Sequence, residues 1–238
     1  YENSFSLNSV FTGAPTKSDV EIVKPEQVTA FEVGYRGRTG KVIIDLNAYY
    51  NTYQDFISND TVLVPFYGEV GDNALSLLAL QQGDFKAYQT YTNSSADVKS
   101  YGATIGLGTK VFGNFDLDGN YTYSKEDFDQ SSAPDFRTSF NTPNHKVKIS
   151  FGNTELFTNF GFNVNYRWSD NYLWQGTFAD GEVPSYSVVD AQVNYKVPSI
   201  KSTFKLGATN IGGNEYFTAF GTGNIGQQYY ASITFNNL

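Results

Sequence analysis

The sequence lacks cysteine and methionine altogether and contains a single histidine, His145. Without cysteine there is no disulfide framework, zinc ribbon, thiol nucleophile or iron–sulfur site. One histidine excludes a metal site built from several imidazoles. Because no Gly-x-Ser-x-Gly motif is present, we interpret His145 as a polar residue at the start of a strand. We therefore expect no catalytic residue, no resident cofactor and no metal site.

Basic residues and long apolar runs are also scarce. The chain has 16 Lys and Arg against 24 Asp and Glu, a net charge of −8, which argues against nucleic acid as a partner. Mean hydropathy is −0.37, and the runs Val62–Tyr67 and Leu75–Leu80 are far shorter than the roughly 18 residues of a membrane-spanning helix. The chain begins at Tyr1 without a signal peptide, so we interpret it as a processed or partial chain.

Aromatic residues and period-two alternation are abundant. Phe, Trp and Tyr make up 17% of the chain, unlike a disordered sequence. From Val42 to Tyr50, apolar even-numbered residues alternate with mostly polar odd-numbered ones, which predicts a strand with two different faces. About nine such strands and almost no helix are predicted: Val28–Arg36, Lys41–Phe56, Lys99–Val111, Phe115–Ser124, Lys146–Gly152, Phe157–Ser169, Tyr186–Val197, Thr203–Asn210 and Gln228–Asn236.

The connections between these strands alternate between short and long. The short ones are Gly37–Gly40, Phe112–Asn114, Asn153–Leu156 and Pro198–Ser202, and the long ones are Ile57–Asp97, Lys125–His145, Asp170–Ser185 and Ile211–Gln227. In an up-and-down sheet, all short turns then lie at one end, as in bacterial outer-membrane barrels with short periplasmic turns and long extracellular loops. The pattern predicts an all-β fold, an antiparallel up-and-down transmembrane β-barrel.

The polar face of nearly every predicted strand carries charge. A soluble sandwich or lipocalin would also alternate, but these charges suit a wide lumen better than one side of a sandwich core. Aromatic residues such as Tyr50, Tyr123 and Trp168 recur toward strand ends, where interfacial girdles lie. The residues predicted to line the lumen, facing a plug, are Glu32, Arg36, Asp45, Asn47, Asp116, Asp118, Lys148, Asn163, Arg167, Asp190 and Gln192.

Strand number and direction predict that the barrel is larger than this chain. If the short turns are periplasmic, the first strand runs from the outside toward the periplasm. The ninth strand then runs in the same direction, and the C-terminus is periplasmic. A single-chain bacterial barrel has an even strand number, so nine strands cannot close alone. Either Tyr1–Leu7 ends an earlier strand, which would make ten, or further strands precede Tyr1.

Five segments carry a family resemblance. Lys24–Tyr35, with the sequence KPEQVTAFEVGY, resembles the strand-start signature of TonB-dependent outer-membrane receptors. Phe140–Lys146 resembles a loop-to-strand junction of that family, and Val183–Asp190 the start of a late strand. Gly207–Tyr216 is similar to its penultimate strand and Tyr229–Phe235 to its last. The Tyr-rich segment Tyr88–Asn93 resembles receptors of Bacteroidetes-type Gram-negative bacteria.

This resemblance implies active transport in the bacterial outer membrane. It implies that residues 1–238 are the C-terminal part of the barrel, about nine strands of a larger one of the 22-stranded kind. Residues 1–24 would be an extracellular loop, alone or with the end of a preceding strand. A plug domain and a TonB box, which engage TonB, ExbB and ExbD, would lie outside this chain. The ligand cannot be named, because one fold serves many ligands.

The long connection Ile57–Asp97 is expected to contain structure or function. Asn73–Gly83 predicts a short helix with Asn73 as N-cap and Gly83 as its stop. It could pack against the loops or contact a ligand, a surface lipoprotein or a larger outer-membrane complex. The loop aromatics that are candidates for such contacts are Tyr67, Tyr88, Tyr91, Trp174 and Phe178.

Several other interpretations stay open at this point. Asp116, Asp118 and Asn120 superficially resemble a calcium loop, but their period-two spacing favours one face of a strand. The acidic residues of the next loop, Glu126, Asp127, Asp129 and Asp135, are a weak cation candidate, and a solvated acidic loop is the alternative. A passive porin or a structural barrel is the alternative function, and an outer-membrane lipase or protease is disfavoured because no nucleophile–histidine pair is recognisable.

Overall fold

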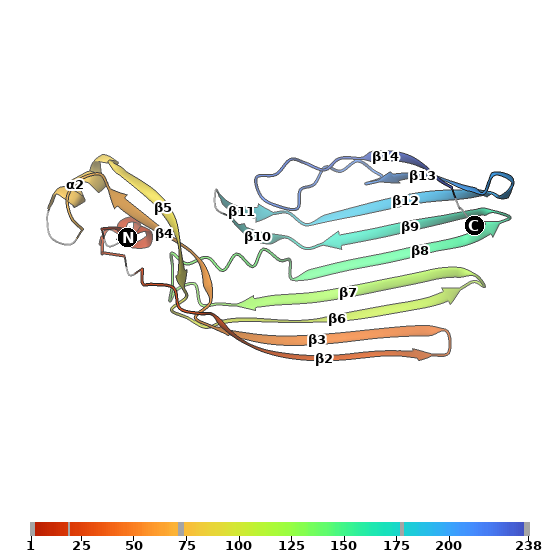
Figure 1. Ribbon diagram of the computed structural model, residues 1–238, viewed down its shortest axis with the longest axis horizontal. Helices are drawn as coiled ribbons and strands as arrows, with labels where there is room; N and C mark the ends of the chain where they lie inside the picture. Colours follow the sequence, from red (N-terminus) through yellow and green to blue (C-terminus); the bar gives the residue numbers. More distant parts are fainter. Residues whose placement is uncertain (1–2, 19, 71–73, 177–178, 236–238) are drawn as a thin grey trace. The chain divides into compact units, whose positions relative to one another are not determined.

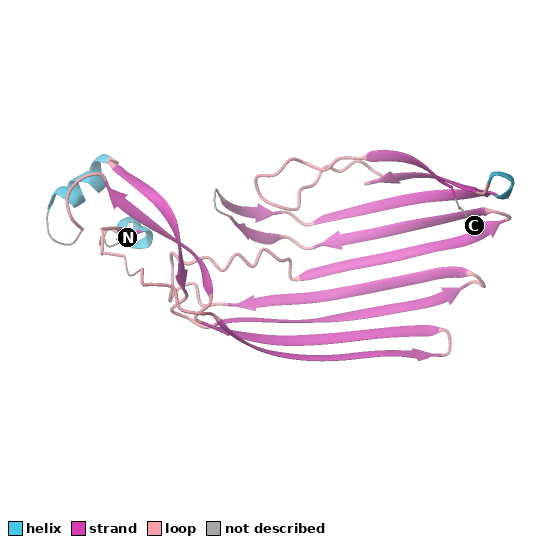
Figure 2. Ribbon diagram, in the orientation of Figure 1, coloured by secondary structure: helices cyan, strands magenta, loops and turns pink. Residues whose placement is uncertain are grey.

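The structure is a computed structural model that describes residues 3–18, 20–70, 74–176 and 179–235. Strands dominate these residues, and the helices are short (Figures 1 and 2). Among the residues described, no helix is both long and apolar enough to cross a membrane. The chain divides into two compact units. The loop unit comprises Tyr1–Ala30, Asn51–Ser100 and Glu126–Phe140, and the wall unit comprises Phe31–Tyr50, Tyr101–Lys125 and Asn141–Leu238.

A nine-stranded sheet is the main element of the fold, and consecutive strands along the chain are neighbours in it, apart from the strands inserted in the long connections. The strand arrows alternate in direction (Figure 1). In spatial order the sheet consists of β2 (Gln27–Thr39), β3 (Val42–Gln54), β6 (Val98–Val111), β7 (Phe115–Asp127), β8 (His145–Phe157), β9 (Phe160–Ser169), β12 (Tyr186–Val197), β13 (Ser202–Thr209) and β14 (Gln228–Phe235). The fold class and the nine main strands predicted from the alternation are therefore confirmed.

The four short turns lie at the same end of the strands (Figure 1). Three of them agree with the predicted short connections, and the β12–β13 turn contains the 3-10 helix η1 (Pro198–Ile200). The exception is the turn predicted at Asn153–Leu156. There β8 continues to Phe157 through a β-bulge, because the Asn153 side chain accepts a hydrogen bond from the Glu155 amide and the chain stays extended. The turn falls instead between β8 and β9, where Asn159 adopts a positive φ of 67°.

The loop unit has its own small sheet and core. Strands β1 (Phe5–Ser6), β4 (Ile57–Pro65) and β5 (Phe85–Asn93) form a sheet in the order β1-β4-β5. Helix α1 (Leu7–Phe11) follows β1, and helix α2 (Ala74–Gln82) lies between β4 and β5. The buried core residues are Phe5, Leu63 and Val70, with Leu7, Val10, Leu80 and Phe85 packed against them. Phe5 and Ser6 pair with Leu63 and Val62, so the strand within Tyr1–Leu7 belongs to this sheet and not to the nine-stranded one.

Helix α2 agrees with the predicted helix at its C-terminal end. Gly83 follows it with a φ of 76°, which a residue without Cβ adopts readily at a helix stop. The predicted N-cap Asn73 lies outside the described residues. The helix buries Ser76 and Ala79 and leaves Leu75, 54% exposed, on its outer side. Leu75, Leu77 and Leu78 of this helix are therefore exposed, whereas its Leu80 packs against the core of the loop unit.

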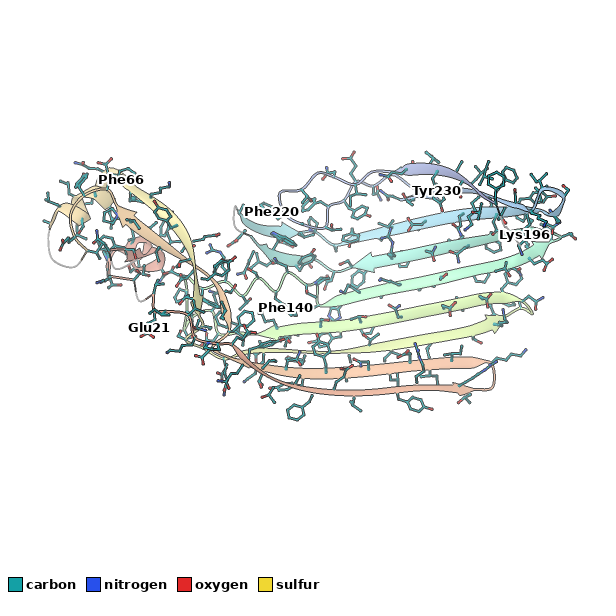
Figure 3. The ribbon with its side chains drawn as sticks, in the orientation of Figure 1. Glu21, Phe66, Phe140, Lys196, Phe220 and Tyr230 are labelled. Carbon is teal, nitrogen blue, oxygen red and sulfur yellow. The ribbon has the colours of Figure 1, made fainter. Side chains whose placement is uncertain are left out.

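The wall unit includes ordered long connections. Strands β10 (Tyr172–Gln175) and β11 (Asp180–Val183) form a hairpin between β9 and β12. The Tyr172 hydroxyl donates a hydrogen bond to the Thr218 carbonyl of the β13–β14 connection at 2.6 Å. The Phe220 ring, labelled in Figure 3, lies where a side chain on Gly181 would project. Direct contacts therefore join these two connections.

Candidate functional site

The predicted lumen residues lie on one face of the nine-stranded sheet, which we call the polar face. The register between strands places Asp118 opposite Ser150 and Lys148 opposite Arg167, and neighbours directly opposite in a sheet project to the same side. A Cβ built on Gly106 of β6 would lie 3.4 Å from the Asp45 Cβ, which places this side of β3 on the same face, and the hydrogen bonds from Arg36 to Asp45 and from Asn47 to Glu32 extend the face to β2. All eleven predicted residues lie on the polar face: Glu32, Arg36, Asp45, Asn47, Asp116, Asp118, Lys148, Asn163, Arg167, Asp190 and Gln192.

Ion pairs and amide bonds connect this face across its strands. Arg36 donates to Asp45, with an Nη2–Oδ2 distance of 2.6 Å. Asn47 Nδ2 donates to Glu32 Oε1 at 2.6 Å. Lys110 Nζ lies 2.6 Å from Asp116 Oδ1. These pairs are solvent-exposed, so each contributes little to stability, about 0–1 kcal/mol. Their main consequence is to fix the orientation of the charges on the face.

The centre of the polar face holds a more buried network. Arg167 Nη2 donates to Asp190 Oδ2 at 2.9 Å, and the Asp190 side chain is only 20% exposed. Asp190 Oδ1 accepts a second bond from the Asn210 backbone amide at 3.0 Å. Asn210 is buried and donates through Nδ2 to the carbonyl oxygens of Asn214 and Ile225. Asp190 therefore joins β9, β12 and the start of the β13–β14 connection.

A concavity of about 480 Å³ lies on the polar face between Arg36 and Asp190. Part of its lining is backbone, because Gly106 and Gly108 of β6 carry no side chain there. The Asp118 carboxylate occupies the space over Gly108: a Cβ built on that glycine would lie 2.5 Å from Asp118 Oδ1. The concavity is thus lined by backbone and by charges of both signs.

The opposite face, which we call the apolar face, carries a band of aromatic residues near the long connections. Tyr50, Tyr101, Tyr123 and His145 follow one another across β3, β6, β7 and β8, with ring centroids 6.2, 6.3 and 5.3 Å apart. The Tyr121 hydroxyl lies 2.7 Å from His145 Nδ1. His145 is the first residue of β8, as its interpretation as a strand-start residue anticipated, and it belongs to this band.

A second band lies nearer the short turns on the same face. Phe151 is 5.4 Å from Phe115 and 5.8 Å from Phe162 between ring centroids. On β7 the two bands are marked by Phe115 and Tyr123, eight residues apart. That separation is about 27 Å along a strand, or about 21 Å across a membrane at a strand tilt of about 40°. The spacing is close to the roughly 25 Å apolar band of outer-membrane barrels.

The acidic residues that suggested a cation site have separate partners. Asp116 and Asp118 lie within strand β7, which excludes a calcium-loop conformation there. Asp129 accepts hydrogen bonds from the Ser131 hydroxyl and amide, and these bonds lower the pKa of Asp129. Asp135 accepts from the Ser6 hydroxyl at 2.5 Å and from the Asn8 amide at 2.7 Å. Among the described residues, no three His, Asp or Glu side chains gather as a metal site would need.

Asp60 is the most perturbed carboxyl of the loop unit. The pKa of Asp60 is raised to about 6, mainly by burial and also by the nearby Asp135 carboxylate, while the Thr61 amide and the Arg137 guanidinium act to lower it. The Thr61 amide donates to Asp60 Oδ1 at 2.7 Å. The sequence offered no signal for this pairing, because Asp60 and Asp135 are brought together only by the fold.

The candidate loop aromatics lie in different surroundings. The Tyr67 hydroxyl donates to Gln82 Oε1 or Asp84 Oδ2, at 2.9 and 3.0 Å, so Tyr67 packs within the loop unit. Tyr91 is 66% exposed on β5, and the alternation of β5 places Tyr88 on its other face. Trp174 is half-buried in β10. Phe178 lies outside the described residues.

Some polar-face residues escaped the predicted set. Tyr230, labelled in Figure 3, passes over Gly207 and donates to Gln192 Oε1 at 2.9 Å. Asn165 lies between Ser150 and Asp190 in the register. Period-two alternation could have found Asn165, whereas Tyr230 follows Gln228 and Tyr229 at the start of β14, and this Gln-Tyr-Tyr sequence gives no clear phase.

Comparisons with known proteins agree with this geometry. The family model described as "TonB dependent receptor-like, beta-barrel" matches residues 2–211. The Copper transporter OprC is similar at a TM-score of 0.62 and 16% identity, over 89% of this chain and 31% of that one. The siderophore receptor PirA from Acinetobacter baumannii is similar at a TM-score of 0.60 and 20% identity, over 89% of this chain and 32% of that one. The apoprotein form of the FrpB iron transporter from Neisseria meningitidis is similar at a TM-score of 0.65 and 13% identity, over 90% of this chain and 32% of that one.

The chain thus spans about a third of the length of these structures. At such low identities the likeness concerns the fold. The search of curated proteins gives no match.

Proposed function

The chain belongs to the β-barrel family of TonB-dependent receptors, and on this premise we propose that it forms part of the wall and outer loops of an active transporter. Its location is the bacterial outer membrane. In this proposal the whole receptor imports a ligand with energy supplied through TonB, ExbB and ExbD. In this proposal the described residues enclose the lumen and bind the ligand, and they perform no chemistry on it.

The observation that carries the proposal is the contrast between the two faces of the sheet. The apolar face has two aromatic bands, separated on β7 by about 21 Å of membrane depth, and such bands lie at the two interfaces of a bilayer. The polar face carries ion pairs and a concavity of about 480 Å³, which suits a water-filled lumen occupied by an inner domain. We assign the eleven predicted residues, Arg167 and Asp190 among them, to this lumen.

The remaining parts of the receptor are proposed from the family. Residues 1–238 would supply nine strands at the C-terminal end of a barrel of the 22-stranded kind, whose lumen a plug fills. Residues 1–24 would be an extracellular loop. The plug and the TonB box would be contributed by a preceding part of the receptor. The Bacteroidetes-type origin stays a prediction from the Tyr-rich segment.

The outer loops are proposed to meet the ligand or a surface partner. Tyr91 is exposed and Trp174 half-buried, and both belong to long connections. Leu75, Leu77 and Leu78 of α2 are exposed at 54, 41 and 40%, and exposed apolar patches often mark protein interfaces. We propose a surface lipoprotein as the partner of this helix. The named structures handle copper, iron or siderophores, and a metal or its chelate is therefore the first ligand class to try.

Uptake in intact cells tests the proposed function. The gene is deleted in its host, and uptake of ⁵⁵Fe-labelled siderophores, radioactive copper and labelled cobalamin is compared with the parent strain, with and without a protonophore. We expect one probe to enter only in energised parent cells. Uptake that continues unchanged in de-energised cells but disappears on deletion contradicts the proposal and supports a passive porin.

A further inference from the structure

Two cationic side chains lie directly opposite each other at the centre of the polar face. Lys148 of β8 pairs in register with Arg167 of β9, and directly opposite residues have Cβ atoms about 4.5–5.5 Å apart. Like charges in this position destabilise a sheet. Both side chains line the same concavity. An anion between them would turn this repulsion into two favourable contacts.

The carboxylates of the wall are already directed elsewhere. Asp190 binds Arg167 Nη2 with one oxygen and the Asn210 amide with the other. Asp118 lies diagonal to Lys148 in the register, but its Oδ1 sits over Gly108 of β6, on the side away from β8. Asp45, the other acidic residue of the concavity, is paired with Arg36.

Both cations keep unused hydrogen-bond donors. Arg167 Nε is buried and has no acceptor among the described residues. Within the same residues, Lys148 Nζ has no carboxylate at ion-pair distance, whereas Arg36, Lys110 and Arg167 each have one. A carboxylate accepts from a guanidinium and an ammonium through separate oxygens, and such charge-assisted bonds are short and strong. The donor arrangement therefore fits a carboxylate that enters the concavity.

We propose that Lys148 and Arg167 form a binding site for a carboxylate supplied from outside this wall segment. The inference rests on the proposed function only in placing the polar face in the lumen. Two sources offer this chemistry: an Asp or Glu of the inner domain of the same receptor, or a free carboxylate-bearing molecule that passes through the lumen. Their shared group is what the site recognises.

A zero-length coupling reaction tests the site in the intact receptor. Carbodiimide activates a carboxylate, and the Lys148 amine then displaces the activating group to form an amide, with loss of the urea by-product. Peptide mass spectrometry identifies the partner. The reaction is run alone and with ¹³C-succinate as the free probe, and Lys205, on the polar face of β13, serves as the control lysine. Arginine does not couple, so only lysine contacts are recorded.

An amide between Lys148 and an Asp or Glu outside residues 3–235 supports the site and identifies the receptor as the source. Succinylation of Lys148 at least about tenfold above Lys205, the ratio that 1.4 kcal/mol gives, supports the site with a free carboxylate as the source. Coupling of Lys148 only to Asp118 or Asp190, or succinylation no higher than at Lys205, overturns the proposal. These results do not depend on energised uptake, so they are separate from failure of the proposed function.

Discussion

Substituting arginine on one face of β8 and then on the other tests which face of the sheet meets lipid and which meets water. Ile149 lies on the apolar face with 44% of its surface exposed, and Ser150 lies beside it on the polar face opposite Asp118. Ile149 is four residues from His145, which belongs to the aromatic band near the long connections. This separation is about 13 Å along the strand and about 10 Å in membrane depth at a tilt of about 40°. Ile149 therefore lies between the two aromatic bands, four residues from His145 and two from Phe151.

We expect Ile149→Arg to cost about 2–4 kcal/mol, the cost of arginine near the bilayer midplane of a barrel, and the lost apolar contact adds to it. Ser150→Arg loses the bond from Asn163 Nδ2 at 2.9 Å, about 1 kcal/mol, and gains the Asp118 carboxylate as a neighbour. We expect its net cost to stay below about 1 kcal/mol.

The assay is urea unfolding of the whole receptor in lipid vesicles, followed by the shift of the folded band in gel electrophoresis. Both variants carry the same added charge on adjacent residues of one strand, so each is the control for the other. A larger cost for Ser150→Arg than for Ile149→Arg would refute the assignment of the faces, and equal costs would show that neither face meets lipid.

Three further predictions follow from the described contacts. Asp60→Asn should stabilise the loop unit above pH 6 by about 1–2 kcal/mol and leave its stability unchanged below pH 4. Because the pKa of Asp60 is raised in the folded state, ionisation of this carboxyl opposes folding. Two pKa units represent roughly 3 kcal/mol, and the partial exposure of Asp60 reduces that figure. Amide hydrogen exchange of the variant and the unsubstituted protein at both pH values measures this difference. Equal protection of the two proteins above pH 6 would contradict it. Gly152→Ala should cost about 1–3 kcal/mol, because the new Cβ would lie 2.7 Å from the Phe162 carbonyl oxygen; unchanged urea unfolding would disprove the close approach. Asn210→Ala should raise proteolysis of the β13–β14 connection, since it removes two hydrogen bonds to carbonyl oxygens, of about 1 kcal/mol each; unchanged cleavage would argue against this clamp.

The nine main strands and their two faces could be predicted from the sequence because alternation is local. In Phe160–Ser169 each residue is apolar or polar in turn, and the register follows once one face is assigned. The turn near Asn153 was misplaced because an Asn-Thr pair is typical of turns, yet here its side chain bonds within a bulge. Local signals cannot separate these two outcomes.

The small sheet of the loop unit could not be predicted. Phe5 pairs with Leu63 across a long stretch of chain, and a two-residue strand has no period to detect. The same holds for Asp135, whose bonds to Ser6 and Asn8 join distant segments. At the polar face the charges were predictable. The direction in which Asp118 turns depends on Gly108 of the neighbouring strand, so sequence alternation could not show that Lys148 has no carboxylate partner among the described residues.

Nitroxide scanning along β9 tests the central claim most directly. The chain has no native cysteine, so single cysteines for the label bring no background from it. We expect labels at alternate positions of the apolar face to be accessible to oxygen, which concentrates in lipid, and labels at the polar face to be shielded from it. The accessible positions should be Phe160, Phe162, Val164 and Tyr166, and the shielded ones Gly161, Asn163, Asn165 and Arg167. Oxygen accessibility that alternates in the opposite phase, or does not alternate, would contradict the account.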